Sequence, residues 1–396
     1  MAAISAMSWN QLPPVGTKAL SWSADYAASP LNFVGFDYTL VNSGTAALGA
    51  ILRWAVQQRS GDARFTVVIP GYACPDLVAA CVYANATPVI VDLEADSYQY
   101  NQTQIAELGS AIDAIICPAL FGISMPLQPL RDSVGQQTLI IEDNAQWFPE
   151  TEINCRRISL EKYKLPENTH QADFFITSFG RGKPVNLLGG GMLAWNNERV
   201  NDFKLHLNAQ SESSTQLRFK SQAFNMLCHP FLYGALTRAP GLNLGATEYH
   251  PLTTVESLSG VRQQGMTAAV LAYLRGHCEI QQQLLQAAPV LWPEQASHKR
   301  LLRFPLIAHS KENRDALVAQ LNRAGLGASP MYARSLASIE GVKALVQTPF
   351  STPVCQQLAD GLLTLPLHKG VKPKHVQQMI HIIDAHRQWL ASKPAA

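Results

Sequence analysis

A lysine and an aspartate are the two side chains whose type and position best suit them to chemistry. Lys183 closes the run Thr177–Lys183 (TSFGRGK), which lies between an apolar stretch and the glycines Gly189–Gly191. Asp143 stands just after the apolar run Leu139–Ile141. A lone lysine is most often a solvated surface charge, but a partly desolvated amine is a nucleophile, and a carboxylate keeps a protonated ring nitrogen charged. The pair predicts an aldehyde cofactor held as a Schiff base on Lys183, with its ring nitrogen facing Asp143.

Two further positions could bind a phosphate of such a cofactor. In the run Asn42–Leu48 (NSGTAAL), Gly44 lets the backbone approach a ligand closely, and a hydroxyl such as that of Thr45 can cap the helix that follows. The free N–H groups at a helix start attract phosphate. Ser178 could donate to the same phosphate, and Arg181 could add a charge-assisted contact. The alternative for the first run is an ordinary capped helix.

Side chains near Asp143 offer alternatives for its role. Glu142 is also acidic, but the alternation of side chains along a strand points it to the opposite face of the sheet. Gln146 could bond a hydroxyl of the cofactor ring, or it could be a polar loop residue. The 11 histidines and 7 cysteines do not show the spacing of metal ligands, so no metal site is predicted.

Composition narrows the class of protein. A chain of 396 residues favours two domains, and 47% hydrophobic with only 15% charged residues indicates extensive buried surface. A net charge of +2 without a basic block argues against nucleic-acid binding. The odd, scattered cysteines indicate a reducing compartment, so a cytoplasmic location is expected. The sequence lacks a signal-peptide pattern and an apolar stretch of ~20 residues, so no membrane span is expected.

The first half of the chain alternates short apolar runs with stretches that suit helices. Helices are expected over 45–58 and 76–83. The apolar runs suit parallel strands covered on both faces, and they are Phe65–Pro70, Pro88–Leu93, Ala114–Pro118, Thr138–Ile141 and Asp173–Thr177. This order predicts an α/β fold with a mostly parallel central sheet, in which Asp143 ends a buried strand at the edge where such sheets bind ligands.

The second half predicts a smaller domain. A long helix over 252–286 could bridge to it. Beyond Arg300 the pattern changes to an α+β mixture, with strands expected over 301–307 and 362–366 and helices over 313–324 and 374–390. We therefore expect a large α/β domain over residues 1–285, with an N-terminal lead-in and the bridging helix, and a small C-terminal α+β domain over residues 286–396.

Taken in order, these stretches resemble the DegT/DnrJ/EryC1/StrS family of aminotransferases, which use pyridoxal 5'-phosphate (PLP) and have the aspartate-aminotransferase fold, fold type I. The stretches similar to family motifs are Ser43–Leu48 (SGTAAL), Ala86–Asp92 (ATPVIVD) after Pro70, Glu142–Gln146 (EDNAQ), Ser178–Lys183 (SFGRGK) followed by Gly190–Gly191, and Leu363–His368 (LTLPLH). The resemblance implies a Schiff-base lysine at Lys183, a ring-nitrogen partner at Asp143, a ring-hydroxyl contact at Gln146, and phosphate contacts at Gly44, Thr45 and Ser178.

The sequence departs from the family pattern at two places. Where the family stacks an aromatic side chain on the cofactor ring, this chain has Cys74, with Tyr72 two residues earlier. Either the thiol packs on the ring or Tyr72 takes over by a changed loop path. The family also extends a residue into the neighbouring subunit's site, but the corresponding stretch here reads Thr247–Pro251 (TEYHP), with Asn243 as a possible substitute.

The resemblance implies a ping-pong aminotransferase with small-molecule substrates. The expected donor is an amino acid, first of all glutamate, and the expected acceptor is a nucleotide-linked keto-sugar. Fold type I also implies a homodimer with its sites at the subunit interface. Two alternatives stay open: another PLP chemistry on this scaffold, such as elimination or dehydration, and a non-catalytic sensor or partner subunit. Relatives that dehydrate sugars carry histidine in place of the lysine, so Lys183 argues against that reaction. Tyr332 and Arg334, in the C-terminal domain, could contact the substrate, or they could lie on a solvent-exposed tip.

Overall fold

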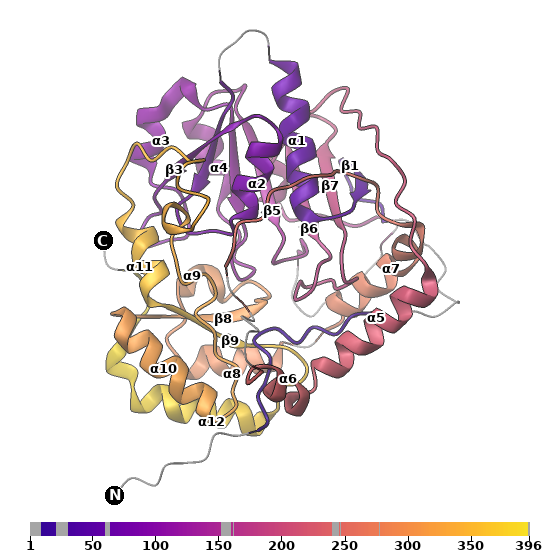
Figure 1. The fold of residues 1–396 in the computed structure, drawn as a ribbon. Helices are drawn as coiled ribbons and strands as arrows, with labels where there is room; N and C mark the ends of the chain where they lie inside the picture. The colour runs from indigo at the N-terminus through magenta and orange to yellow at the C-terminus, as the bar shows by residue number, and fades with distance from the viewer. Residues whose placement is uncertain are drawn as a thin grey trace, which may run out of the picture.

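A mostly parallel sheet forms the central layer of the molecule (Figure 1). The computed structural model describes residues 9–20, 31–59, 64–151, 160, 162–239, 245, 247–276 and 278–394. Within these residues, seven strands pair in the order β1-β7-β6-β5-β4-β2-β3. They are β1 (Phe36–Val41), β2 (Thr66–Pro70), β3 (Thr87–Val91), β4 (Ala114–Pro118), β5 (Leu139–Asn144), β6 (Phe174–Ser178) and β7 (Gly191–Asn196). Strands β2 to β6 pair in parallel, whereas β7 runs antiparallel to both β6 and β1.

Alternate residues of the strands face two different layers of helices. These helices are α1 (Gly44–Gln58), α2 (Asp76–Tyr83), α3 (Gln102–Leu108) and α4 (Leu127–Ser133). Val67 and Ile69 of β2 pack with side chains of α1 and α2, whereas Val68 packs with side chains of α3 and α4. Strands buried on both faces are continuous apolar runs. The predicted α/β fold with a mostly parallel sheet is confirmed.

The sequence predictions do not include β1 or β7. The middle of β1 is partly exposed, so it lacks a continuous apolar run. Strand β7 begins at the last glycine of Gly189–Gly191 and returns the chain antiparallel to β6. This return places the glycines directly beside the segment that carries Lys183, because Phe179 bonds to both Gly189 and Gly190 through the backbone.

The helix predicted over 252–286 is wrong as a single element. The remaining helices are α5 (Ser214–Leu227), α6 (Pro230–Leu236), α7 (Gly260–Leu274), α8 (Glu279–Ala287), α9 (Pro293–Ala296), α10 (Lys311–Arg323), α11 (Pro353–Gly361) and α12 (Pro373–Ala385), with short 3-10 helices η1 (Gly109–Ala111), η2 (Thr169–Gln171), η3 (Leu336–Ser338) and η4 (Arg387–Trp389). The β-branched residues Thr253–Val255, ahead of α7, favour extended backbone. After α7, Arg300 donates to the carbonyl oxygens of Leu274 and Gly276 at 3.1 and 2.6 Å. These bonds satisfy the helix end.

A second sheet lies in the C-terminal part. Its described strands are β8 (Arg303–Ala308), β9 (Leu362–Pro366) and β10 (Leu390–Ala391), which pair antiparallel in the order β10-β8-β9. The strands predicted over 301–307 and 362–366 are confirmed. The helix predicted over 374–390 is too long, because α12 ends at Ala385 and the chain turns through η4 to pair β10 with β8. The predicted boundary after residue 285 falls within α8, and the division into two domains stays a prediction.

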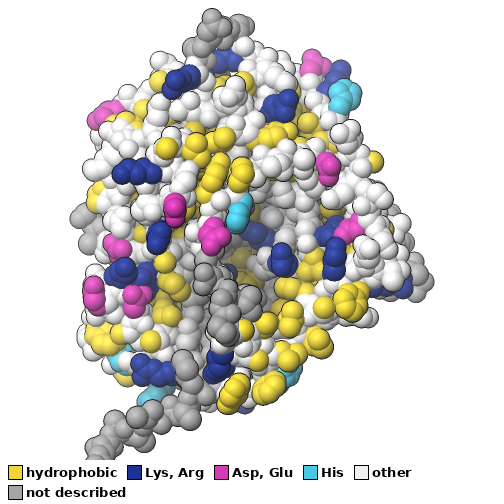
Figure 2. Space-filling model, viewed as in Figure 1, with side chains coloured by type: hydrophobic (Ala, Val, Ile, Leu, Met, Phe, Trp, Pro, Cys, Tyr) yellow, Lys and Arg dark blue, Asp and Glu magenta, His cyan; other side chains and the backbone are white. Residues whose placement is uncertain are grey.

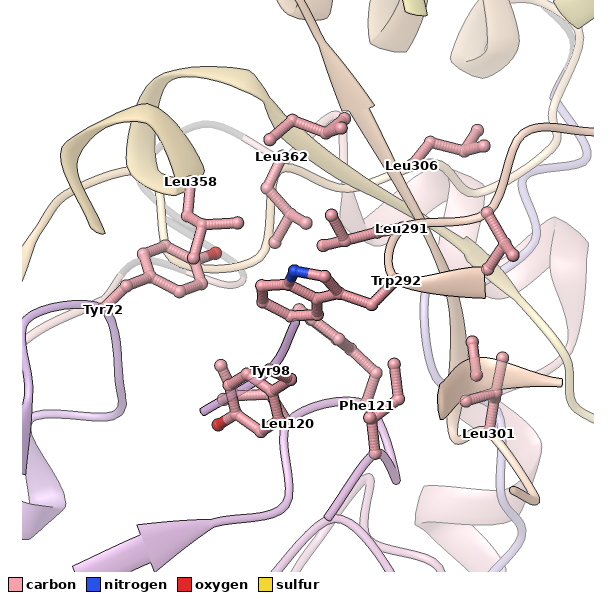
Figure 3. Close-up of a cluster of buried hydrophobic side chains, with 14 of the residues drawn as sticks. Tyr72, Tyr98, Leu120, Phe121, Leu291, Trp292, Leu301, Leu306, Leu358 and Leu362 are labelled. Carbon is pink, nitrogen blue, oxygen red and sulfur yellow. The ribbon is translucent and has the colours of Figure 1, made fainter. Parts of the chain in front are cut away.

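A large apolar cluster joins the C-terminal sheet to loops at the carboxyl ends of the large sheet (Figure 3). Trp292 lies in the middle of this cluster, and its indole ring packs on the ring of Tyr98 with centroids 4.7 Å apart. The neighbours drawn around the indole are Tyr72, Leu120, Phe121, Leu291, Leu301, Leu306, Leu358 and Leu362. The cluster fixes the backbone of Phe121 next to the strand ends, where the candidate site lies.

Residues 9–20 form an N-terminal strap that runs past the C-terminal sheet (Figure 1). Side chains from distant parts of the chain contact its backbone, and one of them, Ser221, donates its hydroxyl to the carbonyl oxygen of Leu20 at 2.6 Å. Nε2 of His368 lies 2.9 Å from one carbonyl oxygen, Asn186 donates to a second at 2.8 Å, and Asn225 of α5 bonds the amide and the carbonyl of Ala19. The strap therefore ties together the C-terminal part, the loop after Lys183 and α5.

Other sequence expectations concern cysteines, metals and membranes. The described cysteines are free thiols, and Cys155 lies outside the described residues. Among the described residues, histidine, cysteine and acidic side chains do not gather into a group that could hold a metal ion. The helices in the same residues are too short or too polar to cross a membrane.

Candidate active site

One cavity lies at the carboxyl ends of β4, β5 and β6, beside the N-terminus of α1. It brings together seven of the residues proposed from the sequence for chemistry or cofactor contact: Gly44, Thr45, Cys74, Asp143, Gln146, Ser178 and Lys183. Its other lining residues are Leu48, Asp76, Leu77, Pro118, Ala119, Leu120, Ala145, Ile176 and Tyr332. This position, outside the carboxyl ends of parallel strands, is where open α/β sheets bind ligands. The individual roles of the residues stay predictions.

Lys183 lies in the turn that follows β6. Gly182 precedes it with a left-handed φ of 73°, a conformation that favours glycine. A partly buried ion pair supports the return of the chain beyond this turn. Arg262 pairs with Glu212 at 2.6 Å and donates to the carbonyl oxygen of Leu187 at 2.6 Å. The loop that carries the Lys183 amine is therefore shaped by the turn at Gly182 and anchored at Leu187 by Arg262.

Asp143 is a buried carboxyl group at the end of β5. Its Oδ1 accepts the N–H of Ala145 at 2.9 Å. Burial raises the pKa of Asp143 to about 6; the negative charges of Asp76 and Glu142 act in the same direction, whereas the Ala145 N–H and the positive charge of Lys183 oppose the shift. Ionising a buried carboxyl group costs free energy, and a cationic partner such as a protonated ring nitrogen offsets part of this cost.

Glu142 occupies a different environment from its neighbour. Its carboxylate is fully buried and accepts from Asn144 at 2.9 Å and from Asn168 at 3.4 Å. Glu142 is outside the cavity lining. The placement agrees with the alternation of side chains along β5, which points consecutive residues to opposite faces of the sheet.

The Gln146 amide has a fixed orientation. Its Oε1 accepts the backbone N–H of Phe121 at 3.0 Å, and its Nε2 donates to the hydroxyl of Tyr332 at 3.3 Å. Phe121 adopts a left-handed φ of 60°, which is uncommon for a bulky residue and often marks a functional site. The sequence named Tyr332 only as a possible substrate contact, and it offered no signal for the Phe121 N–H.

The N-terminus of α1 forms the other end of the cavity. Ser43 caps the helix by accepting the N–H of Ala46 at 2.9 Å. A Cβ on Gly44 would lie 2.8 Å from Cβ of Ser178, so only glycine lets the helix start approach that hydroxyl residue so closely. The Thr45 hydroxyl donates to Oδ2 of Asp76 at 3.0 Å. Asp76 is a site residue that the sequence predictions missed, although it lies two residues after Cys74.

Cys74 and Tyr72 differ in their access to the cavity. Cys74 lines it, whereas Tyr72 is completely buried behind it. The Tyr72 ring packs against the ring of Tyr332 with centroids 5.6 Å apart. Burial, followed by the charge of Asp76, raises the pKa of Cys74 to about 12. The thiol is therefore neutral at ordinary pH and suits packing better than nucleophilic attack.

The remaining candidates lie away from the cavity. Arg181 and Arg334 are exposed, and neither is a lining residue. The stretch 247–251 also falls outside the lining, and Asn243 is not among the residues that the structure describes.

The donor set of the cavity fits PLP. An amine at Lys183 suits an aldehyde, and the desolvated carboxyl group of Asp143 suits a basic ring nitrogen. The glycine-dependent approach of the α1 N-terminus to Ser178 suits a phosphate.

Comparison with known proteins gives a family and a relative. The model of the DegT/DnrJ/EryC1/StrS aminotransferase family matches residues 26–384. GDP-perosamine synthase of Escherichia coli O157:H7 is 27% identical over 175 residues, which make up 43% of this chain and 44% of that protein. The match thus spans less than half the length of this curated relative.

Solved structures with a similar fold cover most of the chain. A Streptococcus pneumoniae protein assigned as a sugar aminotransferase, solved in its PLP form, has a TM-score of 0.63 and 19% identity, covering 89% of this chain and 88% of that chain. A DegT/DnrJ/EryC1/StrS aminotransferase from Brucella abortus has a TM-score of 0.58 and 19% identity, covering 88% and 85%. The predictions of fold type I and of PLP as the family's cofactor are confirmed.

Proposed function

Because the chain belongs to the DegT/DnrJ/EryC1/StrS aminotransferase family, we propose that it is a PLP-dependent enzyme that transfers an amino group from an amino acid to a nucleotide-linked keto-sugar. The observation that carries the proposal is the cavity in which Lys183, Asp143 and the N-terminus of α1 meet. The relative named GDP-perosamine synthase supports a nucleotide sugar as the acceptor class. Glutamate is the proposed amino donor. A cytoplasmic location stays a prediction.

Each residue of the cavity would have a separate role in this reaction. PLP, when bound, supplies an aldehyde for the lysine amine and a ring that withdraws electrons from the reacting carbon. The Nζ atom of Lys183 would hold the aldehyde of the cofactor and, when free, would move a proton as general base and acid. Asp143 keeps the ring nitrogen positively charged. Gln146 would present its amide to the ring hydroxyl, and Gly44, Thr45 and Ser178 would hold the phosphate.

Half-reactions with separate substrates test this function. We expect glutamate to convert the aldehyde form to the amine form, seen as loss of the aldehyde's visible absorption, with release of 2-oxoglutarate. A nucleotide-linked keto-sugar should then restore the aldehyde form. The Lys183→Ala variant is the matched control and should do neither. Conversion by glutamate that only simple keto acids reverse would remove the keto-sugar from the proposal. Failure of every amino donor would favour elimination chemistry or a non-catalytic role.

We also propose that the protein forms a homodimer through the exposed apolar surface of α5 and α6. Figure 2 shows hydrophobic side chains gathered in this area, and Phe219, Met226 and Phe231 are 73%, 59% and 51% exposed. Contiguous exposed apolar surface is typical of an interaction site. The family resemblance supplies the second argument, because fold type I enzymes form their sites between two subunits.

Charged substitutions on this surface should dissociate the dimer. For Phe219→Glu combined with Met226→Lys, we expect the dimer dissociation constant to rise by about 100-fold or more, because charges replace two apolar anchors. Sedimentation velocity over a concentration series measures the change. Val34→Glu is the control, since Val34 is 49% exposed on another part of the molecule and should leave assembly unchanged. An unaltered dissociation constant in the double variant would place the interface elsewhere.

A further inference from the structure

Asp76 is an acidic residue at the end of the cavity that suits a phosphate. It lines the cavity together with Gly44, Thr45 and Ser178, and its Oδ2 accepts the Thr45 hydroxyl at 3.0 Å. It lies in the first turn of α2, where the helix dipole favours an acid. The dipole of α2 makes a carboxylate tolerable at this position. The helix dipole alone, however, does not explain why this carboxylate accepts the hydroxyl of Thr45 at the start of α1.

This contact occupies the only proton that Thr45 can donate. A threonine hydroxyl has a single O–H, and a phosphate dianion accepts hydrogen bonds without donating any. While Thr45 donates to Asp76, it cannot also donate to a phosphate. The negative charge of Asp76 would further repel the dianion, because charges a few Å apart interact strongly in a partly desolvated site. Both effects act against the attraction of the α1 N-terminus and Ser178.

The charge of Asp76 acts across the cavity. It contributes to raising the pKa values of Cys74, Asp143 and Tyr332, three lining residues from different parts of the chain. Thr45, the direct partner of Asp76, stands in the first turn of α1, where a phosphate would be bound. The carboxylate of Asp76 therefore influences the charges in the cavity, in addition to its place in the first turn of α2.

We propose that Asp76 sets how strongly the cavity holds the phosphate of its cofactor, by withholding the Thr45 hydroxyl and by repelling the dianion. The inference rests on the proposed function, since it assumes that PLP is the ligand. Its consequence is a cofactor bound less tightly through its phosphate than the glycine, the helix N-terminus and Ser178 would allow, and therefore more readily exchanged.

Binding measurements on Asp76→Asn test this role independently of catalysis. We expect the Kd for PLP to fall by about tenfold, because one like-charge repulsion is removed and the neutral amide holds the hydroxyl of Thr45 less strongly than the carboxylate does. The Kd for pyridoxal, which lacks the phosphate, should change by less than about twofold. Asp76→Glu keeps the charge and should retain the affinity of the unaltered protein. Thr45→Val should weaken PLP binding more in the Asp76→Asn background than in the native one, since an amide oxygen is a weaker acceptor than a carboxylate and competes less with the phosphate for the hydroxyl.

The outcomes separate this inference from the proposed function. If the unaltered protein binds neither PLP nor pyridoxal, the proposed function fails, and the inference fails with it. If the unaltered protein binds PLP but Asp76→Asn binds it equally or more weakly, only the inference is overturned. An equal gain for PLP and pyridoxal would also overturn it, because the effect would not involve the phosphate. Asp76→Ser, which is small and neutral, provides the same comparison if Asp76→Asn does not fold.

Discussion

Replacement of Lys183 by alanine is expected to lower the rate of transamination by on the order of 10³-fold or more, since the variant loses both its nucleophile and its general base. The change removes the amine from the cavity but leaves Asp143, Gln146 and the start of α1 in place. We therefore expect PLP to bind still, without a covalent bond. Lys183→Arg should be equally inactive, because a guanidinium stays protonated and cannot attack an aldehyde.

Reductive trapping measures this effect without a substrate. Borohydride treatment of the PLP-loaded protein should add the mass of the reduced cofactor to the peptide that contains Lys183. The Lys183→Ala variant should gain no such mass. Lys204→Ala is the matched control, because Lys204 is an exposed lysine outside the cavity, and it should be labelled as the unaltered protein is. Label on any other lysine of the unaltered protein would contradict the assignment.

Asp143→Asn is expected to have opposite effects on activity and on stability. The neutral amide cannot hold a positive charge on the ring nitrogen, so transamination should fall by on the order of 10²- to 10³-fold, the effect of removing one preorganised electrostatic partner. In the protein without cofactor, however, the carboxylate of Asp143 is buried and only partly compensated. The substitution removes the cost of ionising it there.

The sign of the pH dependence follows from the raised pKa. The pKa of Asp143 rises from 3.8 to about 6 on folding, so below pH 4 both states are protonated and the folded protein carries no cost. Between pH 4 and 6 the unfolded chain loses its proton first, so stability falls as pH rises. Above pH 6 the cost is complete and amounts to about 3 kcal/mol, at about 1.4 kcal/mol per pKa unit. Asp143→Asn has no carboxyl group to ionise at this position, so its stability should not fall in this way as pH rises.

Unfolding by urea at several pH values measures the difference. Without cofactor, Asp143→Asn should be more stable than the unaltered protein at pH 8, by up to about 3 kcal/mol, and equally stable near pH 4. Asp37→Asn is the control, because Asp37 is exposed on β1 and should give the same small difference at both pH values. A variant that is less stable than the unaltered protein at pH 8 would contradict the account of the buried charge.

Most strands of the large sheet could be predicted because each leaves a pattern in its own stretch of sequence. Strands buried on both faces need continuous apolar residues, so β2 to β6 are visible in the sequence. Strand β1 is partly exposed and β10 has two residues, so their pairing depends on distant partners and leaves no local pattern. The helix predicted over 252–286 failed for a similar reason, because Arg300, from beyond the helix, satisfies the carbonyl groups where α7 ends.

In the candidate site, too, some residues could be predicted from local sequence and others could not. Residues at strand ends and at the start of α1 could be named from their neighbours in the chain, and Asp143, Ser178 and Gly44 all line the cavity. Tyr332 reaches Gln146 across 186 residues of sequence, which only the packing of the C-terminal part on the large sheet brings about. The N–H of Phe121 enters the site through a left-handed conformation that its residue type does not favour.

The strap at residues 9–20 has a consequence for how the molecule opens. Its backbone carbonyl groups bond to Asn186, which lies in the loop between Lys183 and β7, and to His368, which lies beyond β9. Segments that share bonds with one stretch of backbone tend to lose protection from hydrogen exchange as one cooperative unit. We therefore expect the loop that carries Lys183 and the C-terminal sheet to open together, so that a ligand which stabilises one should also slow hydrogen exchange in the other.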